Sequence, residues 1–232
     1  MGLITFFISA YQNLFLFILK TVKKVFTKRK DLTILKEIDA GANIFSKKKF
    51  CCFDQSDSTK FAHLKGKNYN FSKSQHKLVQ MIDQENWEKV EKMCKLHKSC
   101  AKVPVRDKKT NMTALPIHFA CRKNPNEQAI ISLLEANPDG ACTKIEKTEE
   151  YPLHIACRYE ASYDVIALLV IHCTKAVNVK NVQGQLPLDY VRKSGNQEVA
   201  QFLMDIMEWL HLMTWCHGFI VSGEKSFTCH PR

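Results

Sequence analysis

The sequence predicts an all-α solenoid, in which similar pairs of helices stack on one another. Three eight-residue segments carry this prediction: LPIHFACR at 115–122, YPLHIACR at 151–158 and the more divergent LPLDYVRK at 186–193. Their prolines lie 36 and then 35 residues apart. A second apolar block follows each copy, at 130–134, 165–169 and 199–203. A fixed period in this range is typical of stacked repeats, which bury their apolar faces against their neighbours.

Each copy also makes sense as local structure. Pro116, Pro152 and Pro187 suit the first turn of a helix, where the missing proline N–H would have no partner in any case. Ala120 and Ala156 are small, which lets the helices of successive copies approach closely. We therefore expect one helix to begin at each proline and a second helix to cover each apolar block.

These segments resemble the ankyrin repeat, whose signature is Thr-Pro-Leu-His-x-Ala at a period of about 33 residues. His118 and His154 stand at the His position, whereas Asp189 replaces His in the third copy, and no copy keeps the Thr. The resemblance implies an ankyrin-type solenoid with protein-binding function. It also implies structural roles in the repeat turns for Pro116, His118, Ala120, Pro152, His154, Ala156, Pro187 and Asp189.

We expect a repeat domain over 77–206 with about four repeats, followed by an apolar tail over 207–232. The first repeat is degenerate, because it has two helical patterns but no Pro-x-His turn. Leu78, Val79, Met81 and Ile82 suit its first helix, and Trp87, Val90, Met93, Cys94 and Leu96 suit its second. End repeats are commonly atypical because they cap the stack.

The charge is spread unevenly along the chain. The whole sequence has a net charge of +11, but residues 1–76 carry 14 Lys and Arg against 5 Asp and Glu. Residues 77–205 carry 18 against 16, so that the repeats are nearly neutral. The basic excess therefore favours an anionic membrane surface or nucleic acid as a partner of the N-terminal arm alone.

Residues 1–30 predict a hydrophobic, partly amphipathic helix that is a candidate membrane anchor. Residues 3–19 carry no charge, and a basic run follows at 20–30. Three alternatives stay open: a transmembrane helix, an in-plane interfacial helix and a cleaved signal peptide. Residues 31–76 are polar and rich in lysine and serine, which predicts a flexible, largely disordered basic linker. Because Lys and Arg mark the cytoplasmic side of a membrane, we expect a cytoplasmic protein, membrane-associated on the cytosolic side.

No pattern of catalytic, metal-binding or cofactor-binding residues is recognisable in the chain. It has no phosphate loop, dinucleotide fingerprint, His-Glu-x-x-His helix or nucleophile elbow. The pairs Cys216-His217 and Cys229-His230 do not match the spacing of common zinc sites. We expect no cofactor, no small-molecule substrate and no enzyme activity. The ten cysteines are interpreted as thiols in a reducing compartment, because a long helical chain needs no disulfide framework.

The expected function is therefore the binding of a protein partner. Three polar connecting segments, which we call fingers, lie at 106–113, 144–150 and 178–185. The resemblance implies that they and the adjoining helices form a concave binding face. The residues expected to line it are Arg106, Lys108, Lys109, Lys144, Glu146, Tyr159, Lys180 and Asn181. The alternative is binding of nucleic acid or anionic lipid by the basic N-terminal arm.

Overall fold

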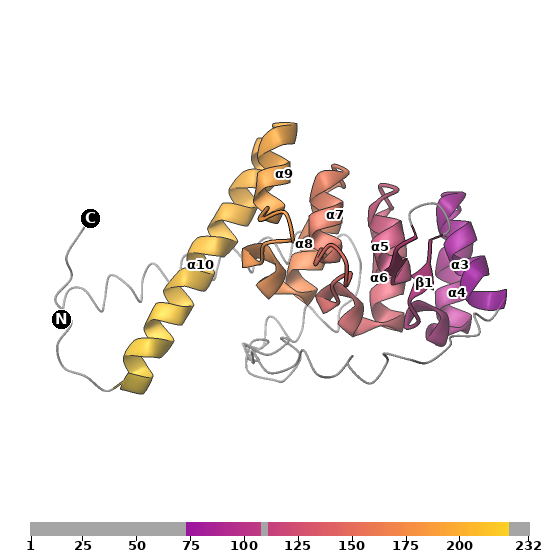
Figure 1. The fold of residues 1–232 in the computed structure, drawn as a ribbon, viewed down its shortest axis with the longest axis horizontal. Helices are drawn as coiled ribbons and strands as arrows, with labels where there is room; N and C mark the ends of the chain where they lie inside the picture. The colour runs from indigo at the N-terminus through magenta and orange to yellow at the C-terminus, as the bar shows by residue number, and fades with distance from the viewer. Residues whose placement is uncertain (1–72, 108–110, 223–232) are drawn as a thin grey trace.

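A computed structural model of the chain describes residues 73–107 and 111–222, with side chains for 77–107 and 111–211. The predicted anchor at 1–30, residues 31–72 of the predicted linker, and Lys108 and Lys109 lie outside the described residues. So does the chain beyond residue 222. The described part contains eight α-helices arranged as a row of pairs, which confirms the all-α repeat architecture (Figure 1).

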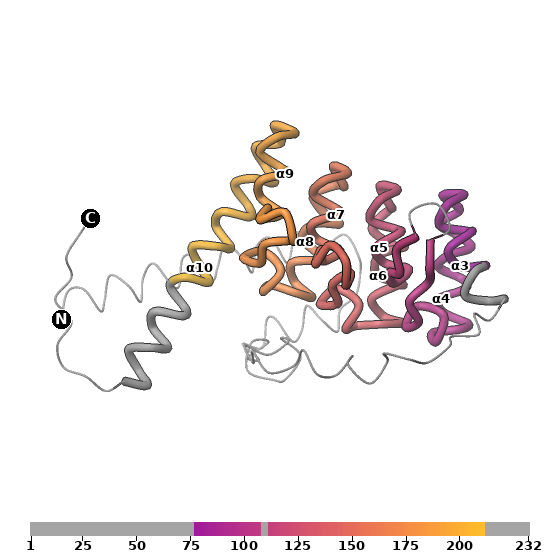
Figure 2. Tube along the Cα trace, in the orientation of Figure 1, coloured from indigo at the N-terminus to yellow at the C-terminus, as the bar shows by residue number. Residues whose placement is uncertain are grey.

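The helices form two layers. The inner layer consists, in order, of α3 (Lys73–Asp83), α5 (Pro116–Cys121), α7 (Pro152–Arg158) and α9 (Pro187–Ser194). The outer layer consists of α4 (Trp87–Leu96), α6 (Glu127–Ala136), α8 (Tyr163–His172) and α10 (Gln197–Ser222). Within each layer every helix contacts the next one in the row, and the helices of each pair also contact each other. The trace in Figure 2 follows this alternation between layers along the row.

The repeats end their helices in a recurring way. Three short 3-10 helices follow the outer helices: η3 (Lys98–Ala101), η4 (Pro138–Cys142) and η5 (Thr174–Asn178). A residue with a positive φ lies one to three positions after the end of α5, α7 and α9, at Asn124, Glu160 and Gly195 respectively. The first finger contains a short antiparallel ladder, in which β1 (Val105–Arg106) pairs with β2 (Thr113–Ala114). Sequence patterns indicated polar connections here and gave no sign of this ladder.

The core runs continuously through the row. Leu78, Ile82, Val90 and Cys94 of the first pair are buried, so α3 and α4 pack as a full repeat without the proline turn. Leu96 is an exception to the predicted pattern, because its side chain is 76% exposed at the last turn of α4. The chain turns away into η3 there, and within the described residues no outer helix precedes α4.

Two predicted boundaries differ from the structure. Helix α3 begins at Lys73, inside the segment that we assigned to the linker. Helix α10 continues from Gln197 to Ser222, so position 206 lies within a helix and does not separate a tail from the repeats. Ile206 and Trp209 are both buried in the core, which explains why the apolar pattern continues past 206. No helix in the described ranges is sufficiently long and apolar to cross a membrane.

Candidate functional site

The repeated histidines connect each turn to the next finger. Nε2 of His118 lies 3.0 Å from the carbonyl oxygen of Thr143, and Nε2 of His154 lies 2.9 Å from that of Val179. Because a carbonyl oxygen only accepts, Nε2 must carry the proton in both residues. Each histidine therefore donates a hydrogen bond from its own turn to the chain that starts the following finger.

Burial keeps these histidines neutral. His118 and His154 are 1% and 0% exposed, and burial lowers the pKa of His118 to about 4 and also lowers the pKa of His154. Nδ1 of His154 accepts a hydrogen bond from the backbone N–H of Tyr151, so a proton on that nitrogen would face another donor. A general base poised near neutral pH is not available at either position.

In the last copy, Asp189 makes the hydrogen bond within the turn but not the one to a following finger. Its Oδ2 atom accepts a hydrogen bond of 2.8 Å from the backbone N–H of Leu186, as Nδ1 of His154 does from Tyr151. A carboxylate has no donor with which to reach a following finger. The substitution of His by Asp at this position fits a repeat after which no further finger occurs in the described chain.

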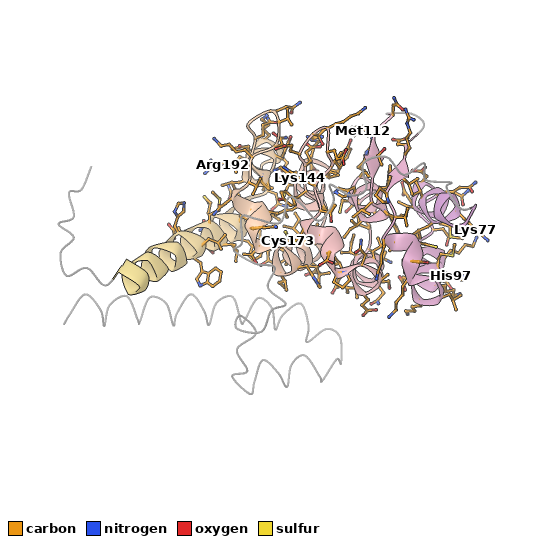
Figure 3. All side chains as sticks on the ribbon, turned by 60° about the horizontal axis from the view of Figure 1, so that its bottom comes forward. Lys77, His97, Met112, Lys144, Cys173 and Arg192 are labelled. Atoms are coloured by element: carbon orange, nitrogen blue, oxygen red, sulfur yellow. The ribbon has the colours of Figure 1, made fainter. Side chains whose placement is uncertain are left out.

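The fingers lie on one side of the row. Met112 and Lys144, from two different fingers, lie along the same side, whereas His97 of the α4–η3 turn lies on the other (Figure 3). We use the name finger-side surface for the fingers together with the exposed parts of α5, α7 and α9. Five residues predicted to bind a partner are exposed on this surface: Arg106, Lys144, Glu146, Tyr159 and Lys180. Lys108 and Lys109 are outside the described residues, so their placement stays a prediction.

Asn181 does not fit its predicted role, because it is only 6% exposed. Its Oδ1 atom accepts hydrogen bonds from the backbone N–H groups of Gln183 and Gln185, at 3.0 and 2.9 Å. Its Nδ2 atom donates to the hydroxyl oxygen of Tyr190 at 2.9 Å and to Oε1 of Glu150 at 3.3 Å. Asn181 therefore organises the third finger from inside and offers no group to a partner.

Glu150 and Arg158 form an ion pair at the centre of this network. The Glu150 side chain is 4% exposed, whereas the Arg158 side chain is 36% exposed and reaches the surface. The guanidinium carbon of Arg158 also lies 4.7 Å from the centre of the Tyr190 ring, within the range of a cation–π contact. The orientation of Arg158 is therefore fixed by groups from the second finger and from α9.

The preceding repeat has a similar arginine. Arg122 stands at the position equivalent to Arg158, and its NH1 atom lies 3.4 Å from Oδ2 of Asp107 in the first finger. Together with Tyr159, the two arginines line a hollow between the fingers and α5 and α7. The hollow is also lined by His118, Phe119 and Ile155 of the inner helices, by Met112, Ile145 and Glu150 of the fingers, and by Ala114 of β2.

The hollow suits side chains of a macromolecule better than a free small molecule. It encloses about 60 Å³, whereas pockets for drug-sized ligands are roughly 300–1,000 Å³. Arginine and tyrosine are the residue types enriched at the energetic centres of protein interfaces. Sequence patterns identified Tyr159 here but not Arg122, Arg158 or Tyr190. The recurrence of Arg at the end of two equivalent helices was the available signal.

The described residues offer little for covalent or metal chemistry. Their six cysteines form no disulfides with one another, and burial raises the pKa of the Cys94 thiol to about 12. Burial likewise raises the pKa of the thiols of Cys121 and Cys157, so none of these three is a thiolate near neutral pH. Within the described ranges no group of three or more His, Cys, Asp or Glu side chains is placed to hold a metal ion.

Comparison with known proteins agrees with this architecture. The family model described as "Ankyrin repeats (3 copies)" matches residues 117–208. This range runs from α5 into the first half of α10. The α3–α4 pair lies before the matched range. A search of the curated proteins found no match to the chain. Ankyrin repeats are in general protein–protein interaction modules and are typically not enzymes. Residues 117–208 of this chain therefore match the ankyrin-repeat family.

Proposed function

We propose that this protein binds a protein partner on its finger-side surface, which corresponds to the concave face of an ankyrin-repeat stack. The observation that carries the proposal is the hollow in which Arg158, held by Glu150 and Tyr190, lies beside Arg122 and Tyr159. A side chain whose orientation is already fixed loses little conformational entropy when a partner binds. The repeat framework therefore presents a pre-ordered binding surface.

The proposal is tested by comparing two variants of the full-length protein as baits in a lysate of its source cells. The first changes Lys144, Tyr159 and Lys180 to alanine, all exposed on the finger side. The second changes Glu135, Glu198 and Gln201 to alanine, all exposed on outer helices. We expect the wild-type bait and the outer-side variant to capture the same protein from the lysate. The finger-side variant should fail to capture it. Equal retention by all three proteins would contradict the proposal.

We also propose that residues 1–30 attach the protein to a membrane with the repeats on the cytosolic side. The argument rests on the sequence, in which the uncharged run at 3–19 precedes the lysines. Two glycosylation sequons, Asn70-Phe71-Ser72 and Asn111-Met112-Thr113, should then stay unmodified, since modification occurs only in a secretory lumen. A mass shift removed by an endoglycosidase and by Asn70→Gln or Asn111→Gln would reverse this topology. A full-length protein that is wholly soluble after cell fractionation without carbonate would contradict the attachment.

A further inference from the structure

In the last three repeats, from α5 to α10, the charges divide between the two sides of the row. Finger-side segments are the fingers and the inner-helix segments 116–123, 152–160 and 187–194. Their described residues, without 108–110, contain 9 Lys and Arg and 6 Asp and Glu. The outer-side segments 124–143, 161–177 and 195–211 contain 1 Lys and 7 Asp and Glu. In these three repeats the described finger side therefore has a net charge of +3 and the outer side one of −6.

Several of the finger-side cations are placed to meet a partner. The Arg122 and Arg158 side chains are 31% and 36% exposed at equivalent positions of adjacent inner helices. NH1 and Nε of Arg158 have no hydrogen-bond partner within the described residues, because both of its described bonds use NH2. Lys180 and Lys193 are exposed and have no ion-pair partner among the described residues.

We propose that the partner segment bound by the finger-side surface is acidic and extended. This inference rests on the proposed function and adds the chemistry of the partner. A surface with a net charge of +3 attracts a negatively charged segment and accelerates its association. Guanidinium groups, with their planar forks of donors, are well suited to carboxylates.

Other occupants fit this surface less well. Residues 1–76 of the same chain carry 14 Lys and Arg against 5 Asp and Glu, so their charge has the same sign as the surface. Nucleic acid needs closely spaced cations along its phosphates. Here Arg122 follows α5 and Arg158 ends α7, and packed helices of this kind lie roughly 8–10 Å apart, so the two guanidinium groups do not form a closely spaced row.

The geometry also predicts the spacing of the acidic residues in the partner. Helices α5 and α7 are in contact, and packed helices lie roughly 8–10 Å apart. An extended chain in the polyproline II conformation advances about 3.1 Å per residue and has three residues per turn, so that every third side chain points the same way. Two carboxylates that each reach one arginine should therefore be about three residues apart along the partner.

A phage-displayed library of random linear 12-residue peptides, selected on the full-length protein, tests this inference. We expect the selected peptides to be richer in Asp and Glu than the unselected library, with acidic residues recurring about three positions apart. Synthetic versions should bind at least about tenfold more weakly to Arg122→Gln/Arg158→Gln, as expected for loss of charge complementarity. Lys180→Gln/Lys193→Gln, at exposed positions, should also weaken binding, which provides a second variant if the arginine variant does not fold.

The matched control is Lys89→Gln/Lys95→Gln, which removes two positive charges from exposed positions of the outer helix α4 and should leave binding unchanged. Peptides that are neutral or basic but sensitive to Tyr159→Ala would overturn the acidic partner and leave the proposed function standing. Peptides insensitive to every finger-side change would overturn both. Three further outcomes would each overturn the inference. The selection could yield no peptide, or the protein could prefer a single-stranded oligonucleotide. It could also self-associate in a way that Lys180→Gln/Lys193→Gln abolishes.

Discussion

The guanidinium group of Arg158 rests on the ring of Tyr190, with its central carbon 4.7 Å from the ring centre. The two residues belong to consecutive repeats and come from α7 and α9. The same guanidinium pairs with Glu150, which lies immediately before the turn of its own repeat. One surface side chain therefore joins a finger, its own inner helix and the next inner helix. This relation links the stability of the stack to the shape of its proposed binding surface.

A double-mutant cycle measures this link. Glu150→Gln and Arg158→Met should couple by about 1–2 kcal/mol in the free energy of unfolding, because Arg158→Met alone leaves a buried carboxylate without its cation. The control cycle uses Lys144→Met and Glu149→Gln, whose ion-paired side chains are 47% and 46% exposed. Exposed ion pairs contribute little to the free energy of unfolding, so the coupling energy in the control cycle should be clearly smaller than that between Glu150 and Arg158. Equal couplings in urea denaturation would contradict the described network.

Close contact between inner helices predicts a large effect at Ala156. This residue is 0% exposed in α7, and Ala156→Arg should cost about 3 kcal/mol or more, because it overpacks the contact and buries a charge. Gln201→Arg introduces the same side chain at an exposed position of α10 and should change stability by less than about 0.5 kcal/mol. Denaturant midpoints measure both effects. An unchanged midpoint for Ala156→Arg would show that the repeat register is wrong.

The positive φ angles of Gly195 and Glu160, just after two inner helices, predict opposite effects of two substitutions on stability. Gly195 has φ of 78°, and no atom lies within 4 Å of an added Cβ, so Gly195→Ala should cost about 1 kcal/mol through backbone strain alone. Glu160, exposed at the equivalent position, has φ of 53°. Glu160→Gly should therefore be neutral or stabilising by up to about 1 kcal/mol. Thermal unfolding of both variants tests this, and a loss of stability in Glu160→Gly as large as that in Gly195→Ala would contradict it.

The buried histidines predict that stability falls in acid. Burial holds the folded-state pKa of His118 at about 4, below the ordinary unfolded value of about 6.5. Below pH 6.5 the unfolded chain therefore binds more protons, and stability is lost progressively as the pH falls towards 4. The slope for one such group is at most about 1.4 kcal/mol per pH unit.

His118→Gln tests the contribution of this residue, since glutamine supplies an N–H donor for the Thr143 carbonyl oxygen but does not titrate. Urea denaturation between pH 4.5 and 7.5 should show a shallower pH dependence for this variant than for the wild type. His97→Gln, at an exposed position, is the control and should retain the wild-type slope. A wild-type slope in His118→Gln would contradict the assignment of a neutral, buried His118.

The repeated pattern predicted the framework because its residues act within one turn or between equivalent positions. The prolines at 116, 152 and 187 do begin α5, α7 and α9, and Ala120 and Ala156 are buried where inner helices contact. These features follow from local backbone chemistry repeated at a fixed period. The family match over 117–208 supports the same framework.

The polar network could not be predicted in this way. Glu150 and Tyr190 are 40 residues apart, and each residue type is common on surfaces when considered alone. The sequence predicts Asn181 on the binding face, because asparagine in a polar loop is usually exposed. In the structure its side chain instead accepts hydrogen bonds from the loop backbone and is buried. The length of α10 does not follow from the sequence pattern, because apolar residues after 206 suit a tail as well as a continued helix.

The central claim is that a protein partner contacts the finger-side surface, and site-specific photocross-linking tests it most directly. In full-length protein, p-benzoylphenylalanine in place of exposed Tyr159 reports on the hollow, and the same group in place of exposed Glu135 reports on the outer helix α6. After irradiation in the source cells, mass spectrometry identifies the attached proteins. We predict a defined protein adduct at position 159 that is absent at position 135. The same adduct at both positions, or one at position 135 alone, would contradict the claim.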